Sequence, residues 1–390
     1  MIDVEAVRAN TPAVASTIHL NNCGSSLPPQ PVVEGAVEYL RLEAEIGGYE
    51  AYWAREDQMN VVYHATARYL GCDPTEVAYT SGAGDSWWRA FAAIPLDVGD
   101  RVLASTAEYQ ANAFALLQAR ERGVIVEVVP NDATGLIDLE VLRSMIDDRV
   151  KLVVLTHIAM ANGAIQPASA VGQIAHEAGA LFLLDSCQAA GQLPLDVDSL
   201  NCDFLAYTGR KFMRAMRGSG ILYARSSVLD QLGHSPFIDG RSAVWTGPDT
   251  FEYQPGAQRF EYGEHNYSGK LALGLATNYA LDVGIPAITE RIATLAKRFR
   301  SGLRSIPNVQ LLDLGLVQSG IVTFSIDGQD CPSVQRKLQV EGINVGAPGR
   351  TNSQWDLGER GLLDVVRAGL HYFNTEAEID RTLEAVAAIA

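Results

Sequence analysis

The chain has 390 residues, of which 47% are hydrophobic and 19% are charged, the balance of an ordinary globular enzyme. This length exceeds what one simple core organises and predicts two domains. The formal net charge of −16 argues against nucleic acid and anionic membranes as partners, because both bind basic patches.

The five cysteines are scattered without a CxxC pair, which is typical of reduced thiols rather than disulfides or a zinc site. No apolar run reaches the ~18–20 residues that a membrane-spanning helix needs. The first ten residues include acidic side chains and lack the basic and apolar regions of a secretory signal. We therefore expect a cytoplasmic protein without a membrane segment or a bound metal.

Residues 31–70 have helical periodicity, and the last turn ends at Gly71. The segment EVAYT predicts a strand, which leads through SGAG into the helical pattern DSWWRAFAAI. Strand-like runs then alternate with helices NAFALLQARER, DLEVLRSMI and SAVGQIAHEAG. The later strands are RVLAS, VIVEVVP, KLVVLTH, LFLLDS, DFLAYT and GILYA.

This alternation predicts an α/β fold with a mostly parallel, buried central sheet. Ligands of such sheets bind beyond the carboxyl ends of the strands. Five strand ends carry polar or glycine residues and are therefore the expected site: 80–84, 105–110, 156–162, 185–188 and 208–211.

The pattern changes near residues 260–270, where two long helical segments begin, followed by IVTFSI, SVQRKLQVEG, INVGAP, VVRAGLHYF and a closing helix. These elements predict a smaller C-terminal α/β domain. We expect an N-terminal arm at 1–20, a large domain at 21–265 and a small domain at 266–390.

Lys211 follows the strand DFLAYT in the motif TGRK. A lysine amine forms an imine with an aldehyde, so a lysine at this strand end is a candidate for covalent attachment of pyridoxal 5′-phosphate (PLP). The same motif also fits a surface lysine.

Asp185 ends the apolar strand LFLLD, and Gln188 follows three residues later. The PLP ring needs a carboxylate against its pyridine nitrogen, and Gln188 suits its phenolate oxygen. The alternative for Asp185 is a helix N-cap, which is common at such turns.

The turn SGAGDSW joins a strand to a helix, and its small residues allow backbone N–H groups to approach a phosphate. Thr208 and Arg210 could contact the same phosphate. Any tight strand–helix turn uses glycine, so this signal is weak alone.

The ordered motifs SGAG, STAEYQAN, THIAMANG, LLDSCQAAG, TGRKF, RGSGILYA and RAGLHYFN resemble the class V aminotransferase family of fold-type I PLP-dependent enzymes. That family includes cysteine desulfurases, isopenicillin-N-epimerase-like proteins and C–S lyases, with ergothioneine-type C–S lyases the nearest group. The resemblance covers nearly the whole chain. It implies a homodimer whose active sites are shared between the subunits.

The resemblance also implies residue roles. Lys211 matches the Schiff-base lysine and general base, Asp185 the partner of the ring nitrogen, and Arg367 the arginine that binds the substrate carboxylate. Without the other motifs, Arg367 would be interpreted as part of a surface ion pair. The remaining cofactor contacts would be Gly82, Ala83, Tyr109, Gln188, Thr208 and Arg210, with Asn266 and Tyr267 in the segment that reaches the phosphate of the neighbouring subunit.

Three departures from the family pattern bear on the reaction. Desulfurases carry a nucleophilic cysteine in the loop that here reads VGAPGRTNSQWD, and Cys331 lies earlier, in a turn before a helix. Tyr109 stands where desulfurases place a histidine, and tyrosine stacks on a ring without offering imidazole acid–base chemistry. Met160 replaces a polar residue, and Asn162 is a candidate substitute.

The substrate is expected to be a small amino acid derivative. Asn22 and Arg350 are candidate substrate contacts, and the aromatic segment EIGGYEAYWARE fits either an open apolar pocket or an ordinary amphipathic helix. The sequence favours β-elimination from a cysteine S-conjugate or its sulfoxide. Transamination, epimerisation and decarboxylating oxidative deamination are the alternatives.

Overall fold

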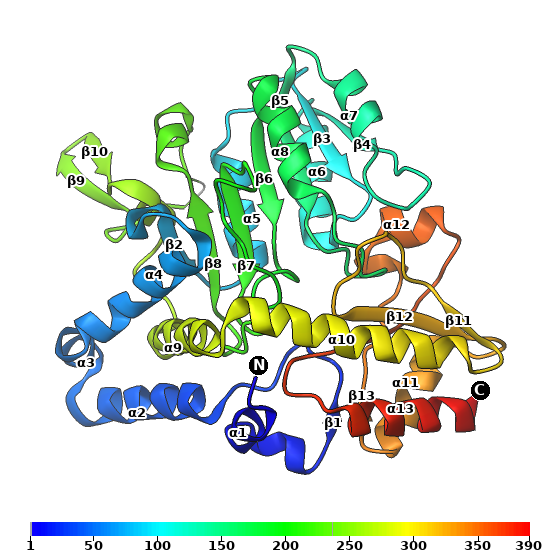
Figure 1. The fold of residues 1–390 in the computed structure, drawn as a ribbon. Helices are drawn as coiled ribbons and strands as arrows, with labels where there is room; N and C mark the ends of the chain where they lie inside the picture. Colours follow the sequence, from blue (N-terminus) through cyan, green and yellow to red (C-terminus); the bar gives the residue numbers. More distant parts are fainter. Residues whose placement is uncertain (1, 236) are drawn as a thin grey trace.

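The computed structural model describes residues 2–235 and 237–390. Figure 1 shows a large central sheet with helices around it and a smaller unit built largely from the C-terminal third of the chain. The long helix α10 (Ile285–Arg304) runs beside the smaller unit.

The central sheet has seven strands in the order β2-β8-β7-β6-β5-β3-β4. β8 is antiparallel to β2 and β7, and all other neighbours are parallel. The predicted mostly parallel sheet is therefore confirmed. Its strands are β2 (Val77–Thr80), β3 (Arg101–Ser105), β4 (Ile125–Val129), β5 (Val150–Thr156), β6 (Leu181–Asp185), β7 (Phe204–Thr208) and β8 (Gly220–Ala224).

Both faces of this sheet are buried, as the continuous apolar strands require. Along β5, Leu152 and Val154 belong to one apolar cluster while Val153 and Leu155 belong to another. Helices α5 (Ala83–Ala93) and α6 (Gln110–Glu121) pack on the first face. Helices α7 (Leu139–Met145) and α8 (Ala168–Glu177) pack on the second.

The predicted helical region at 31–70 forms three helices: α2 (Gln30–Ile46), α3 (Gly48–Ala54) and α4 (Glu56–Leu70). Gly71 ends α4 in the left-handed conformation, with φ of 69°, as a C-terminal glycine commonly does. α2 and α4 both pack against α9 (Tyr267–Val283).

The smaller unit is a three-stranded antiparallel sheet in the order β11-β12-β14 with its own apolar core. Phe299 of α10 packs against Phe324 of the central strand. The strands are β11 (Val309–Leu311), β12 (Ile321–Ile326) and β14 (Val366–Gly369), and the helices beside α10 are α11 (Cys331–Val340), α12 (Gln354–Glu359) and α13 (Glu376–Ile389).

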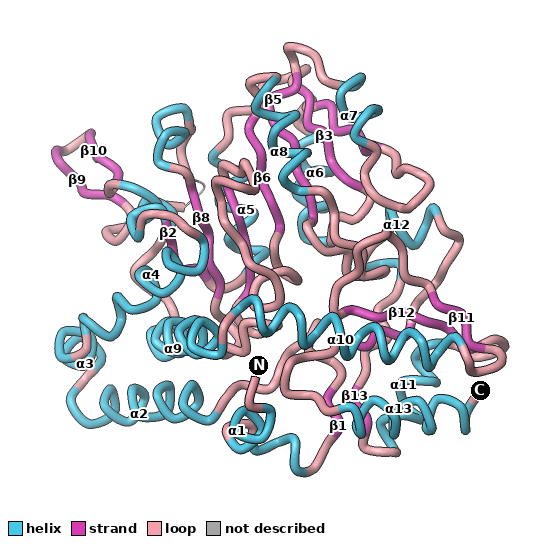
Figure 2. The backbone as a smooth tube through the Cα atoms, in the orientation of Figure 1, coloured by secondary structure: helices cyan, strands magenta, loops and turns pink. Residues whose placement is uncertain are grey.

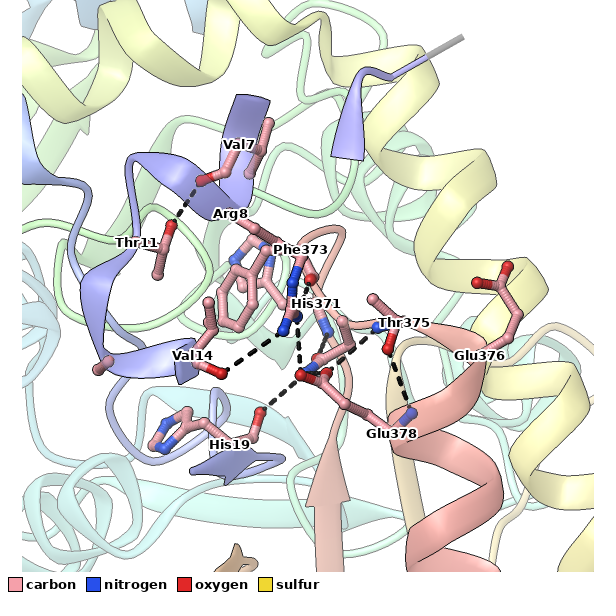
Figure 3. A network of polar contacts seen from close by, with 12 residues as sticks. Val7, Arg8, Thr11, Val14, His19, His371, Phe373, Thr375, Glu376 and Glu378 are labelled. Carbon is pink, nitrogen blue, oxygen red and sulfur yellow. Dashed lines mark hydrogen bonds and ion pairs between the residues drawn. The ribbon is translucent and has the colours of Figure 1, made fainter. Parts of the chain in front are cut away.

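The N-terminal segment docks on this smaller unit. After α1 (Val4–Ala9), the strand β1 (Ile18–His19) pairs in parallel with β13 (Ile343–Asn344). Arg8 donates to the Phe373 carbonyl at 2.9 Å and to Glu378 at 2.7 Å, in the network of polar contacts drawn in Figure 3. The two ends of the chain are thus held together by an ion pair and a strand pairing.

The domain boundaries at 20 and 265 stay predictions. α9 packs against the large unit, because its Ala272, Leu273 and Ala276 lie in the apolar cluster that covers the central sheet. α9 and α10 meet at Gly284, which has a φ of 93°.

The remaining elements connect these bodies. β9 (Ala243–Gly247) and β10 (Thr250–Tyr253) form an antiparallel hairpin that sequence patterning did not indicate. Figure 2 shows this hairpin standing away from the central sheet. The 3-10 turns are η1 (Pro12–Ala15), η2 (Pro74–Glu76), η3 (Ser226–Gln231), η4 (Gly256–Phe260) and η5 (Arg350–Asn352).

Among the described residues, no single helix is long and apolar enough to cross a membrane. α9 and α10 pass that test only as a pair, which is bent by 78°. Over the same residues, no group of three or more His, Cys, Asp or Glu side chains is placed to hold a metal ion.

Candidate active site

A cavity of about 480 Å³ lies where the predicted strand ends meet. Residues from all five of those strand ends line it, together with Arg367 of β14. The parallel register explains the convergence, because β5, β6 and β7 present their carboxyl ends at one edge of the sheet.

Asp185 is the last residue of β6, and its side chain is buried. Asn112 Nδ2 donates to one carboxylate oxygen at 2.8 Å, and the backbone N–H of Cys187 donates to the other at 2.8 Å. Burial raises the pKa of Asp185, while these two donors and the charge of Lys211 favour its ionised form. The carboxylate is thus held in place at the floor of the cavity.

Lys211 lines the same cavity, in the tight turn that follows β7. Gly209 makes this turn possible, because a Cβ there would lie 2.5 Å from Ser219 Oγ. Lys211 Nζ donates to Cys187 Sγ at 3.2 Å. Strand β7 and the β6 turn therefore bring the lysine amine close to the Asp185 segment.

The turn between β2 and α5 supplies a cradle for an anion. Gly82 caps α5, so the unpaired N–H groups and the positive end of the helix dipole face the cavity. A Cβ at Gly220 would lie 2.5 Å from Gly82 Cα, so the neighbouring strand needs glycine for this approach. Thr208 and Arg210 line the cavity from the other side of the cradle.

Arg367 is a buried guanidinium with 8% of its surface exposed. Its Nη1 lies 3.1 Å from Met160 Sδ and 3.4 Å from the Met160 carbonyl, and its buried Nε has no hydrogen-bond partner among residues 2–235 and 237–390. Among the described residues, no carboxylate forms an ion pair with it. A buried guanidinium without an ion-pair partner, at the wall of a cavity, suits an anionic ligand.

The residues present fit PLP. Gln188 Nε2 donates to the Cys23 carbonyl, while its buried Oε1 has no partner in the part of the chain that the structure describes, so the amide keeps hydrogen-bonding capacity in the cavity. A lysine amine, a buried carboxylate and a glycine-edged anion cradle lie in the same cavity. Lys211 would hold PLP covalently, Asp185 would pair with its ring nitrogen, and the cradle would bind its phosphate.

Tyr109 lines the cavity at the start of α6, with 37% of its surface exposed. Its hydroxyl accepts a hydrogen bond from Gln110 at 3.3 Å. Asn162 does not substitute for the polar residue that Met160 replaces, since it donates to Asp356 at 3.0 Å and does not line the cavity.

The structure does not place the predicted substrate contacts Asn22 and Arg350 in this cavity, and Asn266 and Tyr267, which the resemblance directs to a neighbouring subunit's phosphate, also lie outside it. Asn22 donates to the Gly369 carbonyl at 2.7 Å, and Arg350 Nε donates to the Leu362 carbonyl at 2.7 Å. Asn266 instead lines an adjacent cavity of about 400 Å³. Tyr267 packs edge-on against Tyr52 and donates to a backbone carbonyl.

The aromatic segment forms α3 and does not line the cavity. Tyr49 and Trp53 are 73% and 65% exposed, and they stack on each other with ring centroids 6.1 Å apart. The interpretation of this segment as an ordinary helix surface therefore holds within the single chain.

Three site residues were not anticipated from the sequence. Cys187 and Asn112 line the cavity, and Glu108 lies buried behind Asn112. The motif STAEYQAN did contain a signal, because Glu108 and Asn112 are four residues apart, a spacing that brings a side chain just before a helix near one in its first turn.

The model of the Aminotransferase class-V family matches residues 18–382. The chain belongs to this family. PLP is the cofactor of the family's enzymes and of this one, which confirms the resemblance, the fold class and the cofactor that the motifs predicted.

Full-length relatives agree with this assignment. The chain is 27% identical over 392 residues to a probable cysteine desulfurase of Methanothermobacter thermautotrophicus, covering 98% of each chain. It is 26% identical to the apo structure of cysteine desulfurase from Thermococcus onnurineus, with a TM-score of 0.92 and coverage of 100% and 98%. A cystine C–S lyase structure at 22% identity, with a TM-score of 0.87 and coverage of 97% and 99%, shows the fold alone.

Proposed function

We propose that this enzyme is a C–S lyase that cleaves cysteine S-conjugates or their sulfoxides by β-elimination. The observation that carries the proposal is a cavity holding Lys211 and Arg367, combined with a 346–356 segment that contains no cysteine. Persulfide transfer needs a mobile thiol at that loop, and Cys331 is buried at the start of α11. Relatives named cysteine desulfurases support a carbon–sulfur bond as the target.

Each residue has a role in this proposal. PLP, when bound, supplies an electron sink for the electron pair of the Cα–H bond. Lys211 Nζ takes the Cα proton, and Arg367 binds the substrate carboxylate through its unpaired guanidinium face. The Cβ–S bond then breaks, the sulfur leaves as a thiolate or sulfenate, and water converts the remainder to pyruvate and ammonia.

The side of the cavity near Arg367 supports a substrate with an apolar side chain. Met160 and Ile158 line it, and Met160 places a thioether beside the guanidinium. A flexible thioether packs against varied apolar groups without demanding a hydrogen bond.

The test is to incubate the holoenzyme with S-methyl- and S-benzylcysteine and their sulfoxides, and to measure pyruvate and released sulfur compound. We expect equal amounts of the two products from at least one substrate. Arg367→Lys should lower kcat/KM roughly 100-fold, because lysine cannot bind a carboxylate in the bidentate manner of arginine. Absence of both products from every substrate overturns the proposal.

Other outcomes identify the alternatives. Accumulation of the amine form of the cofactor would indicate an aminotransferase, and Cα proton exchange without elimination would indicate an epimerase. Oxygen uptake with carbon dioxide release would indicate a decarboxylating oxidative deaminase. A persulfide on Cys187 after incubation with cysteine would indicate a desulfurase that uses a thiol of the cavity floor.

We also propose that two copies form a homodimer with shared active sites. Asn266 supports this, because its adjacent cavity has Ser81 and Gly218 in common with the first cavity. An exposed residue at this position could reach the phosphate cradle of a second copy. Light scattering should give twice the chain mass of 42.1 kDa, and a monomer with full PLP affinity would contradict the proposal.

A further inference from the structure

A second buried carboxylate lies directly behind Asp185. Glu108 follows β3, and only 1% of its surface is exposed. Asn112, one turn later on α6, connects the two carboxylates. Its single Nδ2 donates to Glu108 Oε2 at 2.9 Å and to Asp185 Oδ2 at 2.8 Å.

All the side-chain partners of Glu108 are donors. Ser105 Oγ donates to Oε1 at 2.7 Å, and Thr156 Oγ1 donates to Oε2 at 3.0 Å. Among the described residues, no cation forms an ion pair with Glu108. A carboxylate fits this environment with both oxygens accepting, whereas a glutamine would replace one of the two acceptors by an NH2 donor.

The orientation of the Asn112 carboxamide decides whether Asp185 faces an N–H donor or a carbonyl oxygen. A carboxamide can present either its oxygen or its nitrogen, and an oxygen facing two carboxylates would be repelled by both. Glu108 fixes the orientation with the nitrogen toward Asp185, because its carboxylate is a second acceptor for the same Nδ2. The Asp185 carboxylate then keeps a donor on each oxygen, from Asn112 and from the Cys187 N–H.

We propose that Glu108 is a positioning residue, which aims the Asn112 amide at Asp185 and so keeps Asp185 ionised against the protonated ring nitrogen of PLP. The series of hydrogen bonds from Glu108 through Asn112 to Asp185 holds the negatively charged Asp185 carboxylate where the ring nitrogen would lie. A protonated ring nitrogen is what makes PLP an effective electron sink. The inference depends on the proposed contact between Asp185 and the ring, and not on the C–S lyase reaction.

The experiment loads the full-length enzyme with PLP labelled with ¹⁵N at the ring nitrogen and records its chemical shift without substrate. The wild-type enzyme should give the shift of a protonated nitrogen. Glu108→Gln should move it toward the unprotonated value and raise the Kd for PLP about 10-fold or more, the effect of losing a hydrogen bond to a charged group. Because no substrate is present, failure of the lyase assay leaves this result unaffected.

Two further variants distinguish a positioning role of Glu108 from a purely structural one. Asn112→Leu should produce the same ¹⁵N shift change, and the double variant should be no worse than either single one, because all three break one chain of contacts. Ser105→Ala keeps the Glu108 and Asn112 contacts, so its ¹⁵N shift should remain that of the wild type. The proposal is overturned if folded Glu108→Gln keeps the wild-type ¹⁵N shift and PLP affinity. If that variant does not fold, the same result in Asn112→Leu overturns it.

Discussion

Two buried carboxylates in this molecule are compensated in opposite ways. Glu261 accepts hydrogen bonds from Tyr63 at 2.7 Å and Arg241 at 3.0 Å, and Lys270 bonds to the same tyrosine hydroxyl at 2.6 Å. Burial alone would raise the pKa of Glu261, but Lys270 and Arg241 hold it below its ordinary value. Glu108 is equally buried and has only neutral donors, so burial raises its pKa to about 7.

The difference indicates what each region is for. The chain neutralises Glu261 with its own cations, as expected of a charge that only holds elements together. Near the cavity, the chain leaves Glu108 without a cation of its own and places Asp185 beside the space where a ligand would bind. Uncompensated buried charge at a cavity is a mark of a functional site, because a bound group with the opposite charge completes it.

The largest expected effect separates Lys211, which lines the cavity, from the buried Lys270. Lys211→Ala should abolish the imine absorbance at about 400–430 nm and steady turnover, while PLP stays bound through its phosphate. Lys270→Met should retain the absorbance band, because Lys270 bonds to Tyr63 and does not line the cavity. The measurement is the absorbance spectrum of each purified variant. Full turnover by Lys211→Ala would contradict the assignment of the lysine.

The next effect concerns stability in the Glu261 region. Glu261→Gln leaves the buried Lys270 and the partly buried Arg241 without a carboxylate, which should lower the free energy of unfolding by about 3–5 kcal/mol. Urea unfolding measures this change, and the imine absorbance of the folded variant should match the wild type. A loss below about 1 kcal/mol would show that this network is as weakly coupled as a surface ion pair.

A pH series tests the Glu108 region. The folded pKa of about 7 exceeds the ordinary 4.5, so between these values the folded state binds more protons than the unfolded state. The stability that Glu108 contributes is therefore present at low pH and is lost as pH rises to about 7, on the order of 3 kcal/mol.

The measurement compares urea unfolding of cofactor-free wild type and Glu108→Gln at pH 5 and pH 8. Asp185 faces Glu108 through Asn112, and Lys211 lies beyond it, but both are present in the two proteins and largely cancel in the difference. Wild type should lose stability relative to the variant as pH rises. Parallel pH profiles would show that Glu108 is not titrating in this range.

Features of the fold and site that depend on local sequence pattern could be predicted, whereas features that depend on contacts between distant residues could not. Buried strands are continuous apolar runs and helices are periodic, so the seven strands of the central sheet follow from local pattern. Asp185 and Lys211 were predicted because each stands at a strand end where its chemistry is locally unusual. The hairpin β9–β10 has only 4 and 5 residues in its strands, and its apolar side chains are largely exposed, which leaves no such pattern.

The remainder of the site depends on contacts across the fold. Asn22 and Arg350 were selected for their residue types, yet their side chains bond to backbone carbonyls that only the folded chain brings near. The connection from Glu108 to Asp185 spans 77 residues and passes through Asn112. No single segment contains that geometry.

The smallest expected effect is at Tyr109. Within the described part of the chain, its hydroxyl bonds to the adjacent Gln110 side chain alone, so Tyr109→Phe keeps the ring and should change kcat/KM by less than about twofold. Tyr109→Ala removes the ring and should lower kcat/KM roughly 5–10-fold by the loss of stacking. Steady-state kinetics on the best substrate decide, and a loss above tenfold in Tyr109→Phe would instead assign proton transfer to the hydroxyl.

The docking of the N-terminal segment has a consequence for how the protein is made. Ile18 pairs with Ile343, and Arg8 pairs with Glu378, so this segment must wait for partners that are synthesised more than 300 residues later. At roughly 5–20 residues per second, that wait lasts on the order of 15–70 seconds, with Leu20 lacking its partners in the smaller unit. Proteolysis of ribosome-bound chains that stop before residue 340 should cut within residues 2–20, whereas the released enzyme should resist cleavage there.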